Sequence, residues 1–157
     1  MLNIKVLFII FSILFFSNTL FGQIKVIDQV SRKISVLNEN SRYEFRIDEI
    51  ENKRLKITFR SDTANYLNKD FGSIYIKSYN DLKELKRLII TGLDEKKDQS
   101  IHLDLGDSQL TLTFVKQLLG GTIVKFTHSY INNPYVRKSS KYLSRSDIDK
   151  LFIFPTY

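Results

Sequence analysis

The sequence contains no cysteine, no tryptophan and only two prolines among its 157 residues. Without cysteine the chain can form no disulfide, no thiolate zinc site and no cysteine nucleophile. A lipid-anchored lipoprotein is excluded as well, because its lipid is attached to a cysteine. The stability of the protein must therefore come from a hydrophobic core, and a chain of this length is long enough to form one.

Only two histidines and six glycines are present, which narrows the choice of metal and phosphate sites. His102 and His128 could bind a metal together with Asp104 if they faced each other on neighbouring strands, and the alternative is a histidine without a metal. The turn at 118–122, "LLGGT", lacks the Lys-Ser/Thr of a phosphate-binding loop. The segment "DTANYLNKD" at 62–70 lacks the glycine and ligand spacing of a calcium loop. We therefore predict neither a metal nor a cofactor.

One long apolar run occurs, and it lies at the N-terminus. Lys5 precedes the apolar residues 6–16, and a short polar stretch leads to Gly22 and Gln23. This order is typical of a secretory signal peptide and resembles bacterial Sec signals. The run is well short of the roughly 20 residues of a transmembrane helix. We predict export to the periplasm or beyond after cleavage near Gly22/Gln23, no membrane span after cleavage, and a single domain at 23–157. An uncleaved membrane anchor is the alternative.

Alternating apolar and polar residues dominate the first half of the mature chain. In "YEFRI", Tyr43, Phe45 and Ile47 share one face, and "LKITFR" at 55–60 repeats the pattern. Such alternation is typical of half-buried antiparallel strands. Residues 33–37 and 73–77 are predicted as further strands, and 24–30 is a candidate strand. The polar segment 61–70 shows no clear pattern.

A helix and a second group of strands follow. Leu82, Leu85, Ile89 and Leu93 form one apolar stripe, and Ser78 is placed to cap the helix with Asp81 three residues later. Gly92 either ends this helix or interrupts it. Strands are predicted at 101–105, 109–116 and 122–130, before a short C-terminal helix with Ser146 as its cap.

The predicted fold class is therefore α+β. It comprises an antiparallel sheet of six to eight strands, an amphipathic helix packed on one face, and the short C-terminal helix. The order of strands followed by a helix, occurring twice, is similar to the strand-helix repeats of Whirly-type single-strand DNA binders. The similarity is at the level of the fold alone, without a shared motif, and fold does not imply function.

The stretch "HLDLGDSQLTLTF" at 102–114 combines His, Asp and the Gly-Asp-Ser of a lipase and esterase family. A two-residue turn at Gly106 and Asp107 pairs Leu103 with Leu110, so that the apolar residues share a face. Ser108 then lies on the leucine face, and His102 and Asp104 lie on the opposite face. A Ser-His-Asp relay requires direct hydrogen bonds between its members, and the strand pattern after Ser108 leaves no nucleophile elbow. The stretch is predicted to be a hairpin and not a hydrolase site.

Charge is unevenly distributed along the chain. Between residues 108 and 146 there is no acidic residue, but there are six basic ones, namely Lys116, Lys125, Arg137, Lys138, Lys141 and Arg145. The last four lie among tyrosines and, together with Tyr135 and Tyr142, form the candidate anion-binding site. Basic groups attract polyanions, and aromatic faces add stacking. The alternative is a solvated loop whose lysines protect a strand edge from aggregation.

Three classes of function follow. The favoured one is an exported, non-catalytic binding protein that contacts an anionic polymer or lipid headgroup, and no intracellular nucleic acid is expected. The second is an envelope protein-interaction or inhibitor module, marked by an exposed apolar patch such as 151–157. The least favoured is an enzyme such as a hydrolase, which would need Asp62, Asp70 and Asp104 to come together.

Overall fold

The computed structural model describes residues 31–39, 42–63 and 70–153. The predicted signal peptide, the candidate strand 24–30 and the end of the tail at 154–157 lie outside the described residues, and export therefore stays a prediction. The elements are β1 (Arg32–Glu39), β2 (Arg42–Glu49), a 3-10 turn (Glu51–Lys53), β3 (Leu55–Arg60), β4 (Phe71–Ile76), α2 (Tyr79–Asp94), β5 (Gln99–Asp104), β6 (Ser108–Lys116), β7 (Thr122–Tyr130), β8 (Asn133–Ser139) and α3 (Arg145–Leu151).

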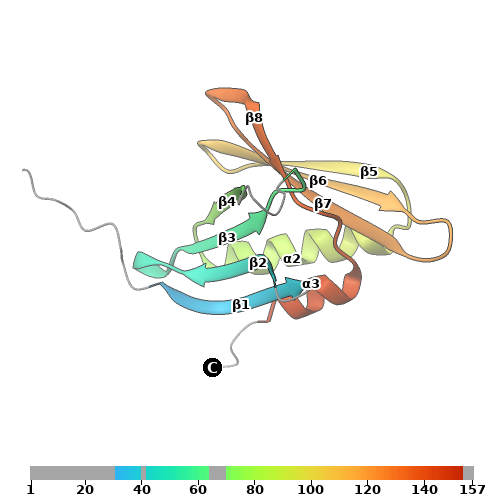
Figure 1. The fold of residues 1–157 in the computed structure, drawn as a ribbon, viewed down its shortest axis with the longest axis horizontal. Coiled ribbons are helices and arrows are strands. Elements are labelled where there is room, and N and C mark those ends of the chain that lie inside the picture. Colours follow the sequence, from blue (N-terminus) through green and yellow to red (C-terminus); the bar gives the residue numbers. More distant parts are fainter. Residues whose placement is uncertain (1–30, 40–41, 64–69, 154–157) are drawn as a thin grey trace, which may run out of the picture.

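The protein is α+β with antiparallel sheets, but its sheet arrangement differs from the prediction. The described strands form two four-stranded sheets, β1-β2-β3-β4 and β5-β6-β7-β8, instead of one sheet of six to eight strands. The reason is that α2 follows β4 and ends the first meander. Alternation shows which residues face a core, but it does not show which strands pair. Figure 1 shows the two sheets meeting above α2, with α3 beside β1.

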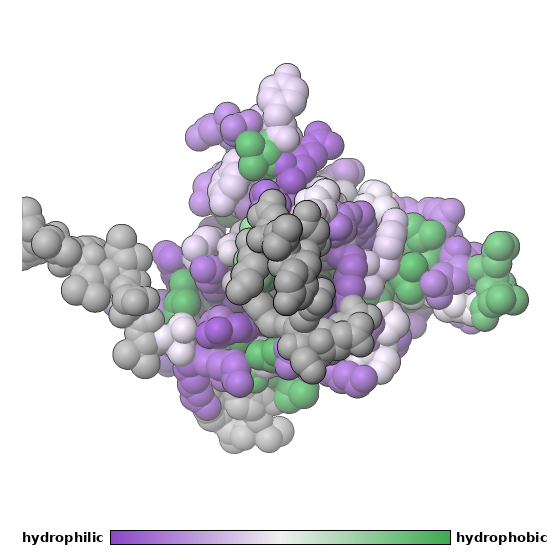
Figure 2. All heavy atoms as spheres, in the orientation of Figure 1, coloured by the Kyte–Doolittle hydropathy of each residue, from purple (hydrophilic) through white to green (hydrophobic). Residues whose placement is uncertain are grey.

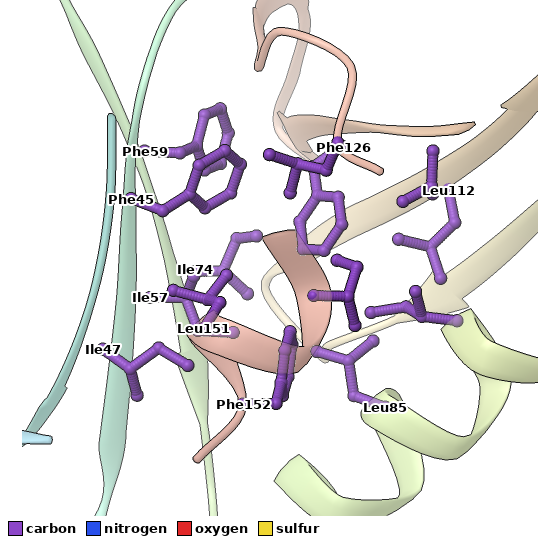
Figure 3. Close-up of a cluster of buried hydrophobic side chains, with 14 of the residues drawn as sticks. Phe45, Ile47, Ile57, Phe59, Ile74, Leu85, Leu112, Phe126, Leu151 and Phe152 are labelled. Carbon is purple, nitrogen blue, oxygen red and sulfur yellow. The ribbon is translucent and has the colours of Figure 1, made fainter. Parts of the chain in front are cut away.

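Aromatic side chains join the two sheets into one core. Phe45 of β2 stacks on Phe59 of β3 with ring centroids 5.7 Å apart. Phe45 also meets the edge of Phe126 of β7 at 5.5 Å, across the boundary between the sheets. Figure 3 shows these three rings above Leu151 and Phe152, which enter the same core from the C-terminal helix. The described start of the tail is thus core at Leu151 and Phe152 and exposed only at Ile153.

The two helices show where sequence signals succeeded and failed. Ser78 caps α2 as predicted, with its Oγ accepting a hydrogen bond from the Asp81 amide at 3.2 Å. Gly92 neither ends nor interrupts α2, which continues to Asp94. The prediction that Ser146 caps α3 is wrong. Ser144 is the cap, because it forms a reciprocal capping box with Asp147.

Candidate functional site

The hairpin predicted from the leucine pattern is confirmed. Leu103 pairs with Leu110, and His102 pairs with Thr111, on opposite faces of the β5–β6 ladder. The Leu105 amide donates to the Ser108 carbonyl at 2.9 Å, which closes the turn. Gly106 has a φ of 97°, a conformation that favours glycine. The Gly-Asp-Ser sequence is therefore the turn of a hairpin.

The two histidines lie on opposite faces of the second sheet and cannot share a metal. His128 pairs with Leu110 and is buried, whereas His102 is exposed, with its Nδ1 3.0 Å from Thr111 Oγ1. Burial lowers the pKa of His128, and the charge of Asp107 partly opposes this shift. Within the described part of the chain, no cluster of three His, Asp or Glu side chains is suited to a metal ion.

Sequence reasoning overlooked one juxtaposition around Ser108. Ser108 lies on the buried face that also carries His128, and Asp107 adjoins both. The Ser108 hydroxyl donates to Asp107 Oδ1 at 3.1 Å, and no hydrogen bond joins Ser108 to His128 among the described residues. The three groups therefore lack the serine-to-histidine contact that activates a nucleophile. The strand register could have indicated this neighbourhood once β6 and β7 were paired.

Two of the four candidate basic residues, Lys138 and Arg145, form ion pairs with acidic residues. Lys138 Nζ lies 2.6 and 2.7 Å from the two carboxylate oxygens of Asp70. Arg145 contacts Asp94 at 2.8 Å and Asp149 at 3.6 Å. Outside the candidate site, Lys125 forms an ion pair with Asp62. Three of the six basic residues between 108 and 146 are thus paired with carboxylates of the folded chain.

The remaining members of the candidate anion site lie on β8 and directly after it. Tyr135, which is 95% exposed, lies on β8 two residues before Arg137, which is exposed too, at an irregularity of the β7–β8 ladder. Arg137 Nε donates to the Pro134 carbonyl at 3.0 Å. Lys141 and Tyr142 follow β8, and Lys125 Nζ lies 5.4 Å from the centre of the Tyr142 ring. The six residues thus belong to β8, the segment directly after it and the start of α3, and the anion-binding site stays a prediction.

A groove of about 520 Å³ lies between the end of β4, the first half of α2 and the β5–β6 hairpin. Leucines form its apolar part, and three of them remain partly exposed although they are apolar. The leucines are Leu85, Leu88, Leu103, Leu105 and Leu110. The charged lining residues are Asp81, Glu84, Asp104 and Lys77. Sequence reasoning missed this groove.

Three carboxylates line the groove against the ammonium group of Lys77 and the guanidinium of Arg87, which pairs with Glu84, so one net negative charge remains in a chain whose net charge is +7. Arg87 hydrogen-bonds to Glu84 and holds the pKa of that carboxyl below its usual value. Asp104 Oδ1 accepts from the Gly106 amide at 2.8 Å, which ties this carboxylate to the hairpin turn. The groove therefore combines leucine side chains with fixed negative charge.

Two other apolar surfaces are exposed at opposite ends of the second sheet. The β6–β7 tip, residues 117–121, carries Leu118 and Leu119, which are 103% and 104% exposed. Figure 2 shows hydrophobic residues at the end of the molecule where Figure 1 places this tip. The second surface is on the β7–β8 hairpin, which stands clear of the helices in Figure 1. Its exposed apolar residues are Tyr130, Ile131, Tyr135 and Val136.

No protein-family model, curated protein or solved structure matches this chain. Neither of the described helices has the length and apolar character needed to cross a bilayer. The groove and the exposed apolar surfaces are thus the features on which a function can be based.

Proposed function

We propose that the protein is a non-catalytic binding module whose groove holds an apolar ligand bearing a positive charge. The observation that carries this proposal is the combination of exposed leucine surface with a carboxylate rim. Leu88, Leu103 and Leu105 are partly exposed to water. Covering them removes apolar surface from water, which is worth about 25 cal/mol per Å².

The size of the groove also suits a ligand. A volume of about 520 Å³ falls within the roughly 300–1,000 Å³ of small-molecule and side-chain pockets. Charged groups at a rim contribute selectivity and association rate more than affinity. We therefore expect the leucines to set the affinity and Asp81, Glu84 and Asp104 to favour cationic ligands over anionic ones.

Each side chain first considered for catalysis forms a hydrogen bond or an ion pair with a neighbour, which favours a non-catalytic role. Asp62 pairs with Lys125, and Asp70 pairs with Lys138. Asp104 supports the β5–β6 turn through the Gly106 amide. Ser108 donates to its own neighbour Asp107.

The proposal is tested with two probes of equal chain length and opposite charge, decylammonium and decanoate, below their micelle concentrations. Isothermal titration should show decylammonium binding at least about tenfold more tightly, a difference that corresponds to about 1.4 kcal/mol. Leu88→Lys, which places a cation in the groove, should weaken this binding. Thr113→Lys, on the outer face of β6, is the matched control. Equal affinity for both probes, or unchanged binding by Leu88→Lys, would contradict the proposal.

One observation supports a second function, the anion binding predicted from the sequence. Tyr135 and Arg137 are both exposed on the edge strand β8, where an aromatic ring and a guanidinium can contact an anionic polymer. This contact would involve fewer cations than the six-residue site suggested by the sequence. It would therefore be weak, and its salt dependence would be shallow, because the slope grows with the number of cations in contact with the polyanion.

A further inference from the structure

We infer that the groove is occupied by the β6–β7 tip of a second copy of the chain, so that the protein assembles head to tail. This inference rests on the proposed function, because it names the ligand of the same groove. Each copy then offers a groove at one end of the second sheet and an apolar tip at the other.

The tip is built to project two leucines. The Gln117 amide donates to the Gly121 carbonyl at 3.0 Å and closes the turn. Gly120 and Gly121 have φ values of 134° and 70°, and these conformations allow the chain to reverse immediately after Leu119. Leu118 and Leu119 are left at the apex, fully exposed. Adjacent exposed leucines at the apex of a turn are an apolar surface that a partner can cover.

The tip cannot reach the groove of its own chain. Leu110, near the start of β6, lines the groove, and the tip follows Lys116 at the end of that strand. A strand rises about 3.4 Å per residue, so the two features lie roughly 20 Å apart along β6. A second copy must therefore supply the leucines that fill a given groove.

The two surfaces differ in charge. Lys116, which is exposed, stands next to the tip, where its amide donates to Asp98 Oδ1 at 2.7 Å, and the groove carries Asp81 and Asp104 beside Glu84, which pairs with Arg87. The β7–β8 hairpin adds apolar surface at the receiving end through the exposed Ile131. This residue lies beside the β5–β6 turn, because the Ile131 amide donates to the Asp107 carbonyl at 3.3 Å. A leucine tip with an adjacent ammonium group therefore has the same chemistry as the ligand class proposed for the groove.

The geometry of this contact determines the kind of assembly. The surfaces that meet are different, so the contact is heterologous and generates open chains or a closed ring. One turn buries less than the roughly 1,200–2,000 Å² of a standard stable interface. Association should therefore be weak and depend on concentration.

Sedimentation velocity between 10 µM and 1 mM tests the inference on protein purified after expression of the full chain, with its N-terminus established by mass spectrometry. The wild-type protein should gain mass with concentration. Leu118→Ser/Leu119→Ser should remain monomeric, because both side chains are exposed and their loss leaves the core intact. Leu88→Lys should also remain monomeric, and Thr113→Lys should assemble like the wild type.

Mixing the tip variant with the groove variant provides a sharper test. One partner keeps an intact groove and the other an intact tip, so a one-to-one complex should form and stop there. A monomeric wild-type protein at 1 mM that still binds decylammonium overturns this inference alone and leaves the proposed function in place. A protein that neither assembles nor binds decylammonium overturns both. Assembly that persists in Leu118→Ser/Leu119→Ser also overturns the inference.

Discussion

Lys138 of β8 forms an ion pair with Asp70 at the start of β4, with Nζ 2.6 and 2.7 Å from the two carboxylate oxygens. The pair is partly buried and links the two sheets, since Asp70 precedes the first residue of β4. Lys138→Met should therefore lower the free energy of unfolding by about 1 kcal/mol, at the upper end of values for partly exposed pairs. Urea denaturation measures this change. Arg137→Gln, on the exposed face of the same strand, is the control and should leave the free energy nearly unchanged.

Retention on heparin distinguishes the two roles assigned to the basic stretch. Tyr135→Ser/Arg137→Gln should elute at lower salt than the wild type, because these residues form the exposed face of β8. Lys138→Met and Arg145→Gln should elute close to the wild type, because their charges already meet carboxylates. An equal loss of retention in all these variants would favour the six-residue site predicted from the sequence.

The sequence predicted individual elements well because local chemistry determines them. The pairing of Leu103 with Leu110 followed from alternation and from Gly106 in the turn. β8 was missed as a strand, because Pro134 and the mixed residues around it show no alternation. The interruption of the strands by α2 did not reveal that two sheets form, since periodicity carries no information about strand partners.

The candidate site was less predictable than the fold. The groove combines residues of β4, α2 and the β5–β6 hairpin, and no spacing in the sequence reveals that Leu88 lies near Leu105. The charge excess at 108–146 was visible, but its partners Asp62, Asp70 and Asp94 lie far away in the chain. Three of those basic residues therefore have carboxylate partners that a local charge count cannot show.

The cap of α3 provides a direct comparison of two serines. Ser144→Ala should lower the free energy of unfolding by about 1 kcal/mol, because it removes the acceptor for the Asp147 amide. Ser146→Ala should have little effect, because Ser146 lies inside the helix and is exposed. Thermal unfolding of the two variants measures the difference. A larger loss for Ser146→Ala would restore the cap predicted from the sequence.

His128 makes stability depend on pH. Burial lowers its pKa in the folded state, with Asp107 opposing the shift, whereas the unfolded chain titrates near 6.5. The unfolded state therefore binds more protons than the folded state once the pH falls below about 6.5. Stability should decrease there by at most about 1.4 kcal/mol per pH unit, until the pH reaches the pKa of the folded state.

Urea titrations from pH 5 to pH 8 measure this dependence on His128. His128→Gln should flatten the slope of stability against pH below pH 6.5. The loss of stability caused by the substitution itself should be the same at every pH. His102→Gln, on the exposed face, should retain the slope of the wild type. The neighbouring charges are Asp107 and Lys138, which pairs with His128 in the ladder. Unchanged slopes in His128→Gln would assign the pH dependence to the carboxylates.

Gly92 allows α2 to approach β6 closely, and this contact can be tested against helix propensity. A Cβ at Gly92 would overlap with Cζ of Phe114, which is buried in the core. Gly92→Ala gains up to about 1 kcal/mol in helix propensity. The overpacked contact costs about 1–3 kcal/mol because the buried ring must shift to make room for the new methyl group. We therefore expect a net loss of stability by urea denaturation, and the double variant Gly92→Ala/Phe114→Leu should recover part of it. A net gain in Gly92→Ala would show that the helix and Phe114 separate at little cost.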